Sequence, residues 1–198
     1  MRIGVLALQG DYDAHRRVLE RLGAACVFVR KPEALDQVDA LIIPGGESTA
    51  LLTFLQEHDF FGKLKNFARS KPTFGTCAGA ILLAKEVVGP EQPSLDVLDV
   101  RIRRNAYGRQ IESSIRQGTL TGKPLEMVFI RAPKFERVGK KVEVLARERG
   151  DPVLVRENNV LAATFHPEMT DNTRVHETFL ELVRSKDTQA TEAHEQFP

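Results

Sequence analysis

Short runs of apolar residues alternate with helical patterns through the first half of the chain. Apolar runs of about four to eight residues predict strands, and amphipathic segments between them predict helices. The predicted strands are residues 2–8, 26–29, 40–43 and the segment that leads into Gly75, with a helical pattern after the first, third and fourth. This alternation is typical of βαβ units and of a parallel sheet.

Between Leu95 and Leu161 the pattern changes to short alternating runs separated by turn residues. Alternation of this kind is typical of antiparallel strands with one buried face. The predicted strands are residues 97–103, 110–115, 127–130, 142–146, 153–156 and 160–163. We therefore predict an α/β fold of three αβα layers, flavodoxin-like or Rossmann-like, whose mixed sheet gains antiparallel strands in the second half.

The last periodic segment predicts a helix over residues 173–183. Its apolar side carries Val175, Phe179, Leu182 and Val183. This stripe suits packing on the sheet, and we expect His176 to face solvent. Residues 186–198 have little apolar surface to bury and are predicted to form a polar C-terminal tail. No linker or internal repeat is visible before them, so we predict one domain over residues 1–185.

Composition limits the function classes. The chain has 198 residues, 42% of them hydrophobic, which is enough to bury the core of a single domain. Its net charge is +1 with both signs mixed, so we expect no nucleic-acid or acidic-surface partner. The N-terminal apolar run is too short for a signal sequence, and no run reaches the ~20 residues that cross a bilayer. Two cysteines without a disulfide framework suit a reducing compartment, and we expect a soluble cytoplasmic protein.

Cys77 lies where an apolar segment turns into a helix, flanked by Gly75 and Gly79. A G-x-C-x-G pattern is the cysteine form of the nucleophile elbow, whose glycines permit a strained turn and leave room for substrate. The helix N-terminus would favour the thiolate, and the N–H of Ala78 would point to an oxyanion. The alternative is a small buried apolar cysteine, which is how we interpret Cys26.

Gly45 and Gly46 lie between the strand at residues 40–43 and a helical pattern. Two glycines here allow positive φ and a close approach of the backbone to a ligand. A plain tight turn explains the same residues equally well. Phosphate binding is less consistent, because the segment lacks a Walker lysine and G-x-G-x-x-G spacing, and Glu47 would repel phosphate.

His166, Pro167 and Glu168 follow the last predicted strand. Side chains alternate along an extended chain, so we expect residues 166 and 168 to face the same way. Pro167 disfavours the helical region for His166, which supports this conformation. Glu168 would then accept a hydrogen bond from the imidazole and orient the ring as a base. A lone histidine would more often be structural.

Three arginines, Arg101, Arg103 and Arg104, have two interpretations. They could form a solvated strand edge, or Arg104 could open a loop over residues 104–109 that holds a carboxylate. The residues alone favour neither.

The glycine pair, Cys77 and the His-Pro-Glu run each follow a predicted strand, and sites in open parallel sheets form beyond the carboxyl ends of strands. Six segments carry a resemblance, namely LALQG (6–10), PGGEST (44–49), FGTCAG (74–79), RNAYGRQ (104–110), FIRAP (129–133) and FHPE (165–168). Together they resemble the class I, triad-type glutamine amidotransferases, and within them the glutaminase subunits of pyridoxal 5'-phosphate synthase. The resemblance covers about residues 1–185.

The resemblance implies hydrolysis of L-glutamine to L-glutamate and ammonia through a thioester. Cys77 would attack the side-chain amide, His166 would move the protons, and Glu168 would hold His166. The oxyanion would be bound by backbone N–H groups of Gly45 or Gly46 and of Ala78. The rest of the substrate would be held by Gly45, Gly46, Glu47, Arg104, Ile130 and Arg131.

The resemblance also implies a partner that consumes the ammonia. This would be a barrel-shaped synthase subunit with a dodecameric core, which builds pyridoxal 5'-phosphate and contacts the chain near Gln9 and Gly10. We expect no cofactor and no metal in this chain. The alternatives are a class I glutaminase of imidazole or anthranilate synthesis, a cysteine peptidase or chaperone on a similar sheet, and an inactive binding module, which the triad residues disfavour.

Overall fold

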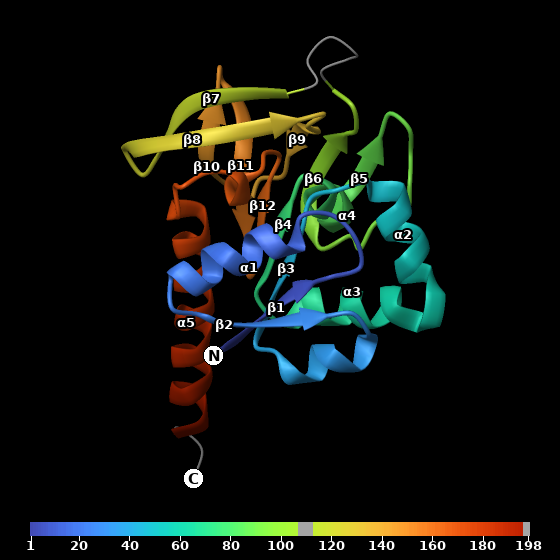
Figure 1. Ribbon diagram of the computed structural model, residues 1–198, viewed down its shortest axis with the longest axis vertical. Helices are drawn as coiled ribbons and strands as arrows, with labels where there is room; N and C mark the ends of the chain where they lie inside the picture. The colour runs from blue at the N-terminus through green and yellow to red at the C-terminus, as the bar shows by residue number, and fades with distance from the viewer. Residues whose placement is uncertain (107–112, 196–198) are drawn as a thin grey trace.

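The computed structural model describes residues 1–106 and 113–195 of the chain. Its centre is a seven-stranded sheet in the order β10-β11-β12-β4-β3-β1-β2 (Figure 1). The strands are β1 (Arg2–Leu6), β2 (Ala25–Val29), β3 (Ala40–Ile43), β4 (Thr73–Thr76), β10 (Glu143–Glu148), β11 (Asp151–Glu157) and β12 (Val160–Ala163). The run from β12 to β2 is parallel, while β10 and β11 pair antiparallel at one edge. The predicted mixed α/β sheet is therefore confirmed.

Helices cover both faces of this sheet and make three layers (Figure 1). One face carries α1 (Tyr12–Arg21) and α5 (Arg174–Glu195), and the other carries α2 (Ser48–Gln56), α3 (Phe60–Ser70) and α4 (Ala78–Leu83). Short 3₁₀ helices are η1 (Pro32–Gln37), η2 (Glu57–Asp59) and η3 (Pro167–Met169). Successive side chains of a buried strand serve opposite faces, so Leu41 packs in the α2 and α3 core whereas Ile42 packs in the α1 and α5 core.

Two smaller sheets hold the remaining strands. One consists of β5 (Ala84–Val88), β6 (Leu98–Arg103) and β9 (Lys134–Val138), and the other is the hairpin of β7 (Ser113–Leu120) and β8 (Lys123–Ile130). The predicted antiparallel additions thus join the main sheet only at β10 and β11, because alternation reveals a strand's buried face and not its hydrogen-bonding partner. The first part of the predicted strand 110–115 lies outside the described residues.

Helix α5 is longer than predicted, running to Glu195 instead of ending near residue 183. The apolar stripe stops there, but the following residues include alanines, glutamates and a glutamine, which propagate a helix well. Among the described residues, no helix is long and apolar enough to cross a membrane.

Two expectations about burial need correction. His176 does not face solvent, because it is fully buried on the face of α5 that also carries Phe179, three residues further along the helix. Cys26 is half-buried and not fully in the core, because β2 is an edge strand of the sheet. Burial raises the pKa of the Cys26 thiol to about 11, so this thiol is a poor nucleophile near neutral pH.

Gly79 sets the position of α4 against the sheet, and this predicts the effect of adding a methyl group. A Cβ on Gly79 would come within 2.1 Å of the Ile43 carbonyl oxygen, so β3 or α4 must move. We expect Gly79→Ala to lower the free energy of unfolding by about 1–3 kcal/mol in urea titrations.

The matched control is Gly62→Ala within α3, where the nearest atom is the flexible Asp59 carboxylate at 3.0 Å. Alanine stabilises a helix interior relative to glycine by up to about 1 kcal/mol. An equal effect of the two substitutions would contradict the close packing of α4.

Candidate active site

The carboxyl ends of four neighbouring strands, β12, β4, β3 and β1, meet at one edge of the sheet. His166 follows β12, Cys77 follows β4, Gly45 and Gly46 follow β3, and Gln9 follows β1. The structure therefore brings together the three features that the sequence places at strand ends.

Cys77 occupies the sharp turn between β4 and α4. Its backbone has φ 48° and ψ −102°, a positive-φ conformation that a non-glycine residue adopts at a cost. Its N–H donates to the carbonyl of Ala163 at 2.9 Å, which ties the turn to β12. Gly75 and Gly79 permit this geometry, since a Cβ on Gly75 would lie 2.5 Å from the Gly79 carbonyl carbon. This is the nucleophile-elbow arrangement.

His166 and Glu168 are in direct contact. Nδ1 of His166 lies 2.7 Å from Oε1 of Glu168, and both side chains are almost fully buried. The predicted extended conformation is wrong, because the chain turns at Pro167 into η3, and proline is well suited to the first position of a helix. The short turn still leaves the carboxylate within reach of the ring.

The surroundings of His166 favour its charged form. Burial opposes a charged ring, but hydrogen bonds with Cys77 and Glu168, together with their negative charges, outweigh it and raise the pKa of His166 to about 10. At neutral pH the ring therefore carries a proton on both nitrogens. Because this pKa lies above the unfolded value of about 6.5, the resulting stabilisation is complete below pH ~6.5 and is lost as the pH rises through about 10.

Gly45 lies against both of these groups. A Cβ at this position would come within 2.3 Å of the His166 ring and 3.3 Å of the Cys77 Cβ. A side chain would therefore block the space between the sulfur and the ring, so glycine is required by close approach.

The loop after β1 is joined to the Gly45-Gly46 loop. The Asp11 N–H donates to the Gly45 carbonyl at 3.3 Å, and the Glu47 N–H donates to Oε1 of Gln9 at 3.1 Å. Gly10 has φ +82°, and a Cβ there would lie 1.8 Å from the same Gly45 carbonyl oxygen. Gln9 and Gly10, the predicted partner-contact residues, thus touch the predicted oxyanion loop.

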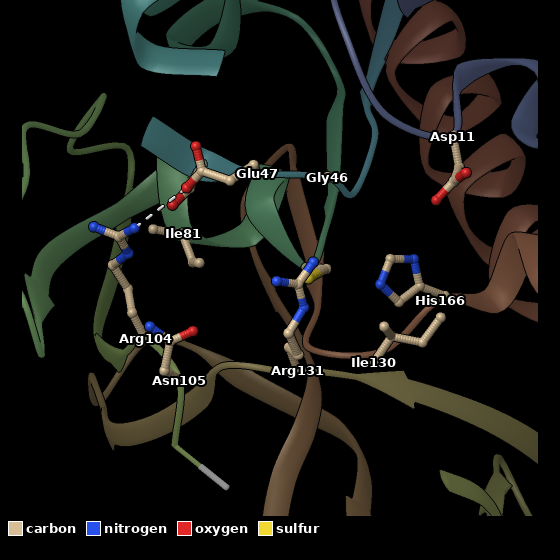
Figure 2. A pocket seen from close by; sticks show the side chains of 11 residues that line it. Asp11, Gly46, Glu47, Ile81, Arg104, Asn105, Ile130, Arg131 and His166 are labelled. Atoms are coloured by element: carbon tan, nitrogen blue, oxygen red, sulfur yellow. Dashed lines mark ion pairs between the residues drawn. The ribbon is translucent and has the colours of Figure 1, made fainter. Parts of the chain in front are cut away.

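A pocket of about 290 Å³ adjoins Cys77 and His166 (Figure 2). Small-molecule pockets commonly span about 300–1,000 Å³, so this one suits a ligand as small as an amino acid. Of the residues predicted to bind substrate or oxyanion, Gly46, Glu47, Arg104, Ile130 and Arg131 line it. Gly45 and Ala78 are not among its lining residues: Ala78 follows Cys77 in the chain, and a Cβ on Gly45 would lie 3.3 Å from the Cys77 Cβ.

Glu47 and Arg104 lie next to each other on one side of the pocket, and Figure 2 marks their ion pair. The Arg104 guanidinium lies 3.6 Å from Glu47 Oε1 and donates to the Thr49 hydroxyl at 2.9 Å. Glu47 also caps α2, accepting from the N–H groups of Thr49 and Ala50 at 3.0 and 2.6 Å. Partial burial alone would raise the pKa of Glu47, but these hydrogen bonds outweigh it and lower that pKa.

The structure distinguishes the two interpretations of Arg101, Arg103 and Arg104, a solvated strand edge and a carboxylate-binding loop. Arg101 and Arg103 pair with Glu136 on the surface of the β6–β9 sheet, as a solvated strand edge would. Arg104 turns instead toward the pocket. Residues 107–109 of the predicted loop lie outside the described residues.

Strand β8 delivers Ile130 and Arg131 to the other side of the pocket (Figure 2). Arg131 directly follows the strand and has φ 42°. The N–H of His166 donates to the carbonyl of Val128 at 2.8 Å, which fixes β8 against the histidine loop.

The pocket has lining residues that the sequence analysis did not identify, namely Asp11, Ser48, Ile81 and Asn105. Each is one to four residues from a predicted site residue, so proximity in sequence is the signal that could have found them. Asp11, His166 and Glu168 offer possible metal ligand atoms within 4.8 Å of one another. The His166–Glu168 hydrogen bond already engages one atom of each of the latter two, which disfavours a metal there.

The sequence was compared with those of known protein families and known proteins. The sequence model of the SNO glutamine amidotransferase family matches residues 5–185. The chain belongs to the SNO glutamine amidotransferase family. A pyridoxal 5'-phosphate synthase subunit PdxT from Koribacter versatilis is 60% identical over 187 residues, covering 93% of this chain and 97% of its own. A PdxT subunit from Thermosipho africanus is 51% identical, covering 93% and 100%.

Solved structures agree with this membership. A crystal structure of a glutamine amidotransferase is 50% identical, with a TM-score of 0.87 over 91% of this chain and 98% of that chain. A putative GMP synthase protein from Thermoplasma acidophilum, only 18% identical, has a TM-score of 0.67 over 96% and 98%, and shares the fold. The predicted resemblance to the glutaminase subunits of pyridoxal 5'-phosphate synthase is confirmed.

The contact between His166 and Glu168 predicts how the histidine titrates in a variant. Glu168→Gln removes a negative charge 2.7 Å from Nδ1, so the protonated ring loses a stabilising partner. We expect the pKa of His166 to fall by about 1–3 units in an NMR titration of the imidazole carbon protons. A value equal to that of the unmodified protein would show that Glu168 does not hold the charged ring.

Proposed function

We propose that this chain is the glutaminase subunit of a pyridoxal 5'-phosphate synthase and hydrolyses L-glutamine with Cys77, His166 and Glu168. The observation that carries the proposal is the positive-φ turn at Cys77 beside a His166 ring that Glu168 holds at 2.7 Å. A nucleophile, a base and an orienting carboxylate in this arrangement suit acyl transfer. The family membership supports glutamine as the acyl donor.

The reaction proceeds through a thioester. The Cys77 sulfur, as thiolate opposite protonated His166, attacks the side-chain amide carbon and forms a C–S bond. The developing oxyanion accepts hydrogen bonds from the Ala78 N–H and from Gly45 or Gly46. His166 then donates its proton to the leaving nitrogen as the C–N bond breaks, releasing ammonia and leaving the thioester.

Hydrolysis restores the enzyme. A water molecule attacks the thioester carbon while His166 accepts its proton, and the C–S bond breaks to give glutamate and the Cys77 thiolate. Glu168 keeps His166 oriented through both steps by accepting from Nδ1.

The opposite charges of the pocket suit the amino-acid end of the substrate. Arg104 and Arg131 offer guanidinium groups to the α-carboxylate, and the Glu47 carboxylate can pair with the α-ammonium. Gly46 and Ile130 line the same pocket as Cys77, next to which the side-chain amide would lie.

Ammonia released in this pocket must reach a synthase. We propose the barrel-shaped synthase subunit with a dodecameric core as the partner, and the loop at Gln9 and Gly10 as a contact. That loop bonds directly to the Gly45-Gly46 loop and to Glu47, so partner binding there would act on the oxyanion donors. Two unpaired cysteines support a reducing, cytoplasmic location.

Other class I glutaminases are the second candidate. The 50–60% identity to PdxT subunits, over more than nine-tenths of the chain, favours vitamin B6 synthesis over imidazole or anthranilate synthesis. Recovery of a cyclase in a pull-down, in place of a pentose-phosphate-using barrel, would overturn the assignment. A glutamine affinity label that modifies Cys26 and spares Cys77 would reject the site itself.

Cys77→Ser separates the two activities of the complex. Serine keeps the size of the side chain but lacks the thiolate, so glutaminase activity should fall below detection. Synthesis of pyridoxal 5'-phosphate from added ammonium by the complex with the synthase subunit should continue. Loss of both activities would mean that Cys77 is structural, and glutaminase assays with and without the synthase subunit provide the reference.

Glu168→Gln tests the third member of the triad. We expect the glutaminase rate to fall by roughly 10³ to 10⁴, because a misoriented histidine of a triad costs about this much. Steady-state assays of the complex measure the loss. A decrease of less than tenfold would remove Glu168 from the triad.

A further inference from the structure

A chain of buried polar side chains lies behind Glu168, on the side away from the pocket. His15 of α1 reaches toward the carboxylate, with its Nε2 lying 3.5 Å from Glu168 Oε2 and 3.2 Å from the Thr76 hydroxyl. The other ring nitrogen, Nδ1, is 2.9 Å from Nε2 of His176 on α5. Glu168 thus stands between two histidines, His166 on one oxygen and His15 on the other.

These groups have no access to water and carry no positive charge. The side chains of His15, Thr76 and His176 are fully buried. Burial, reinforced by the nearby rings of His176 and His166, holds the pKa of His15 well below its usual range. Burial and the charge of Arg21 lower the pKa of His176 to about 3. Each of the two rings therefore carries a single proton near neutral pH.

Two proton arrangements are possible for the pair. If His15 carries its proton on Nδ1, it donates to His176 Nε2. The proton of His176 then sits on Nδ1, which has no hydrogen-bond partner among the described residues, and Glu168 Oε2 faces a lone pair.

If His15 carries its proton on Nε2, the hydrogen bond with Thr76 leaves that N–H 3.5 Å from Glu168 Oε2, and His176 donates from Nε2 to His15 Nδ1. The group left over is then a bare acceptor, Nδ1 of His176, instead of a buried N–H. Orphaned buried donors are rarer than orphaned acceptors. Glu168 Oε2 has no hydrogen-bond partner among the described residues, and the second arrangement turns the nearest ring nitrogen, 3.5 Å away, from a lone pair into an N–H.

We propose that neutral His15, held in its Nε2–H form by His176, is a positioning residue that donates to Glu168 Oε2 and so fixes the carboxylate for its bond to His166. The inference rests on the proposed role of Glu168 in the triad. A carboxylate with one anchored oxygen is free to rotate about its terminal bond, whereas two anchored oxygens define its plane.

Packing alone explains these histidines less well. Both rings lie edge-on to Phe74, with centroids 6.2 and 5.8 Å away, and Phe179 completes the cluster. Apolar side chains would fill such a site without burying polar atoms, which costs free energy when they lack partners. The ring nitrogens instead contact one another and Glu168 in sequence, from His176 to His15 to the carboxylate.

The decisive measurement needs no substitution. NMR of the protein with ¹⁵N-labelled histidine distinguishes Nε2–H from Nδ1–H in a neutral ring. We expect His15 to be the Nε2–H tautomer, coupled to a hydrogen-bonded Nδ1–H of His166. A His15 proton on Nδ1 would overturn the proposal.

Matched variants then test function in the assembled synthase complex. A glutamine amide nitrogen reaches about the place of histidine Nε2, and an asparagine amide about that of Nδ1. His15→Asn should therefore lower kcat about 10- to 100-fold with KM for glutamine unchanged, by analogy with outer partners that orient metal-bound histidines. His15→Gln should restore most of the rate. Equal rates for the two variants, or a change confined to KM, would overturn the proposal.

Phe179→Leu is the control for packing, since it alters the same cluster without touching a polar atom. It should lower the unfolding temperature and leave both kcat and the His166 Nδ1–H signal intact.

The variants also distinguish failure of the proposed triad from failure of this inference. If Glu168→Gln is fully active, Glu168 is not a member of a catalytic triad. If Glu168→Gln is inactive while His15→Asn has the unmodified rate, only the role of His15 fails.

Discussion

The hydrogen-bonded pairing of β4 with β3 on one side and β12 on the other is the constraint on which the site depends. It places the ends of three strands side by side, so that a cysteine, a glycine loop and a histidine meet although the sequence separates them widely. Because side chains alternate along a strand, a shift of one residue in either pairing would turn a strand's side chains to the opposite face. Gly79 lets α4 approach β3 closely, because a Cβ there would lie 2.1 Å from the Ile43 carbonyl oxygen.

Two neighbouring buried histidines differ in charge, because His166 is protonated and His15 is neutral. His166 lies between a sulfur and a carboxylate, and their negative charge outweighs the cost of burying its positive ring. His15 lies farther from the same carboxylate, and its complete burial, reinforced by the nearby rings of His176 and His166, lowers its pKa and keeps it neutral. Glu168 can therefore balance a charge with one oxygen and accept from a neutral donor with the other. The two histidines therefore differ in pKa because of their distances from charged groups and their surroundings, and not because of residue type.

The local features of this chain were predictable, but their partners were not. Apolar periodicity located the strands of the main sheet, and the glycines and His-Pro-Glu at strand ends pointed to the site residues that the pocket brings together. Periodicity does not report which strands pair, so the separate β5-β6-β9 and β7-β8 sheets were missed. His176 was misjudged because a polar residue within an apolar stripe resembles a surface position until its buried partner on α1 is known.

The parallel pairing of β12 with β4 joins Val160 to Thr73, so segments from the two halves of the chain must meet before the pocket exists. Long-range contacts of this kind close large loops and form slowly compared with helices or hairpins. The thiol at the end of β4 therefore lacks its histidine until β12 pairs with β4. Nucleophilic reactivity at Cys77 is thus a property of the finished sheet, which keeps a strained and reactive cysteine unactivated in the partly folded chain.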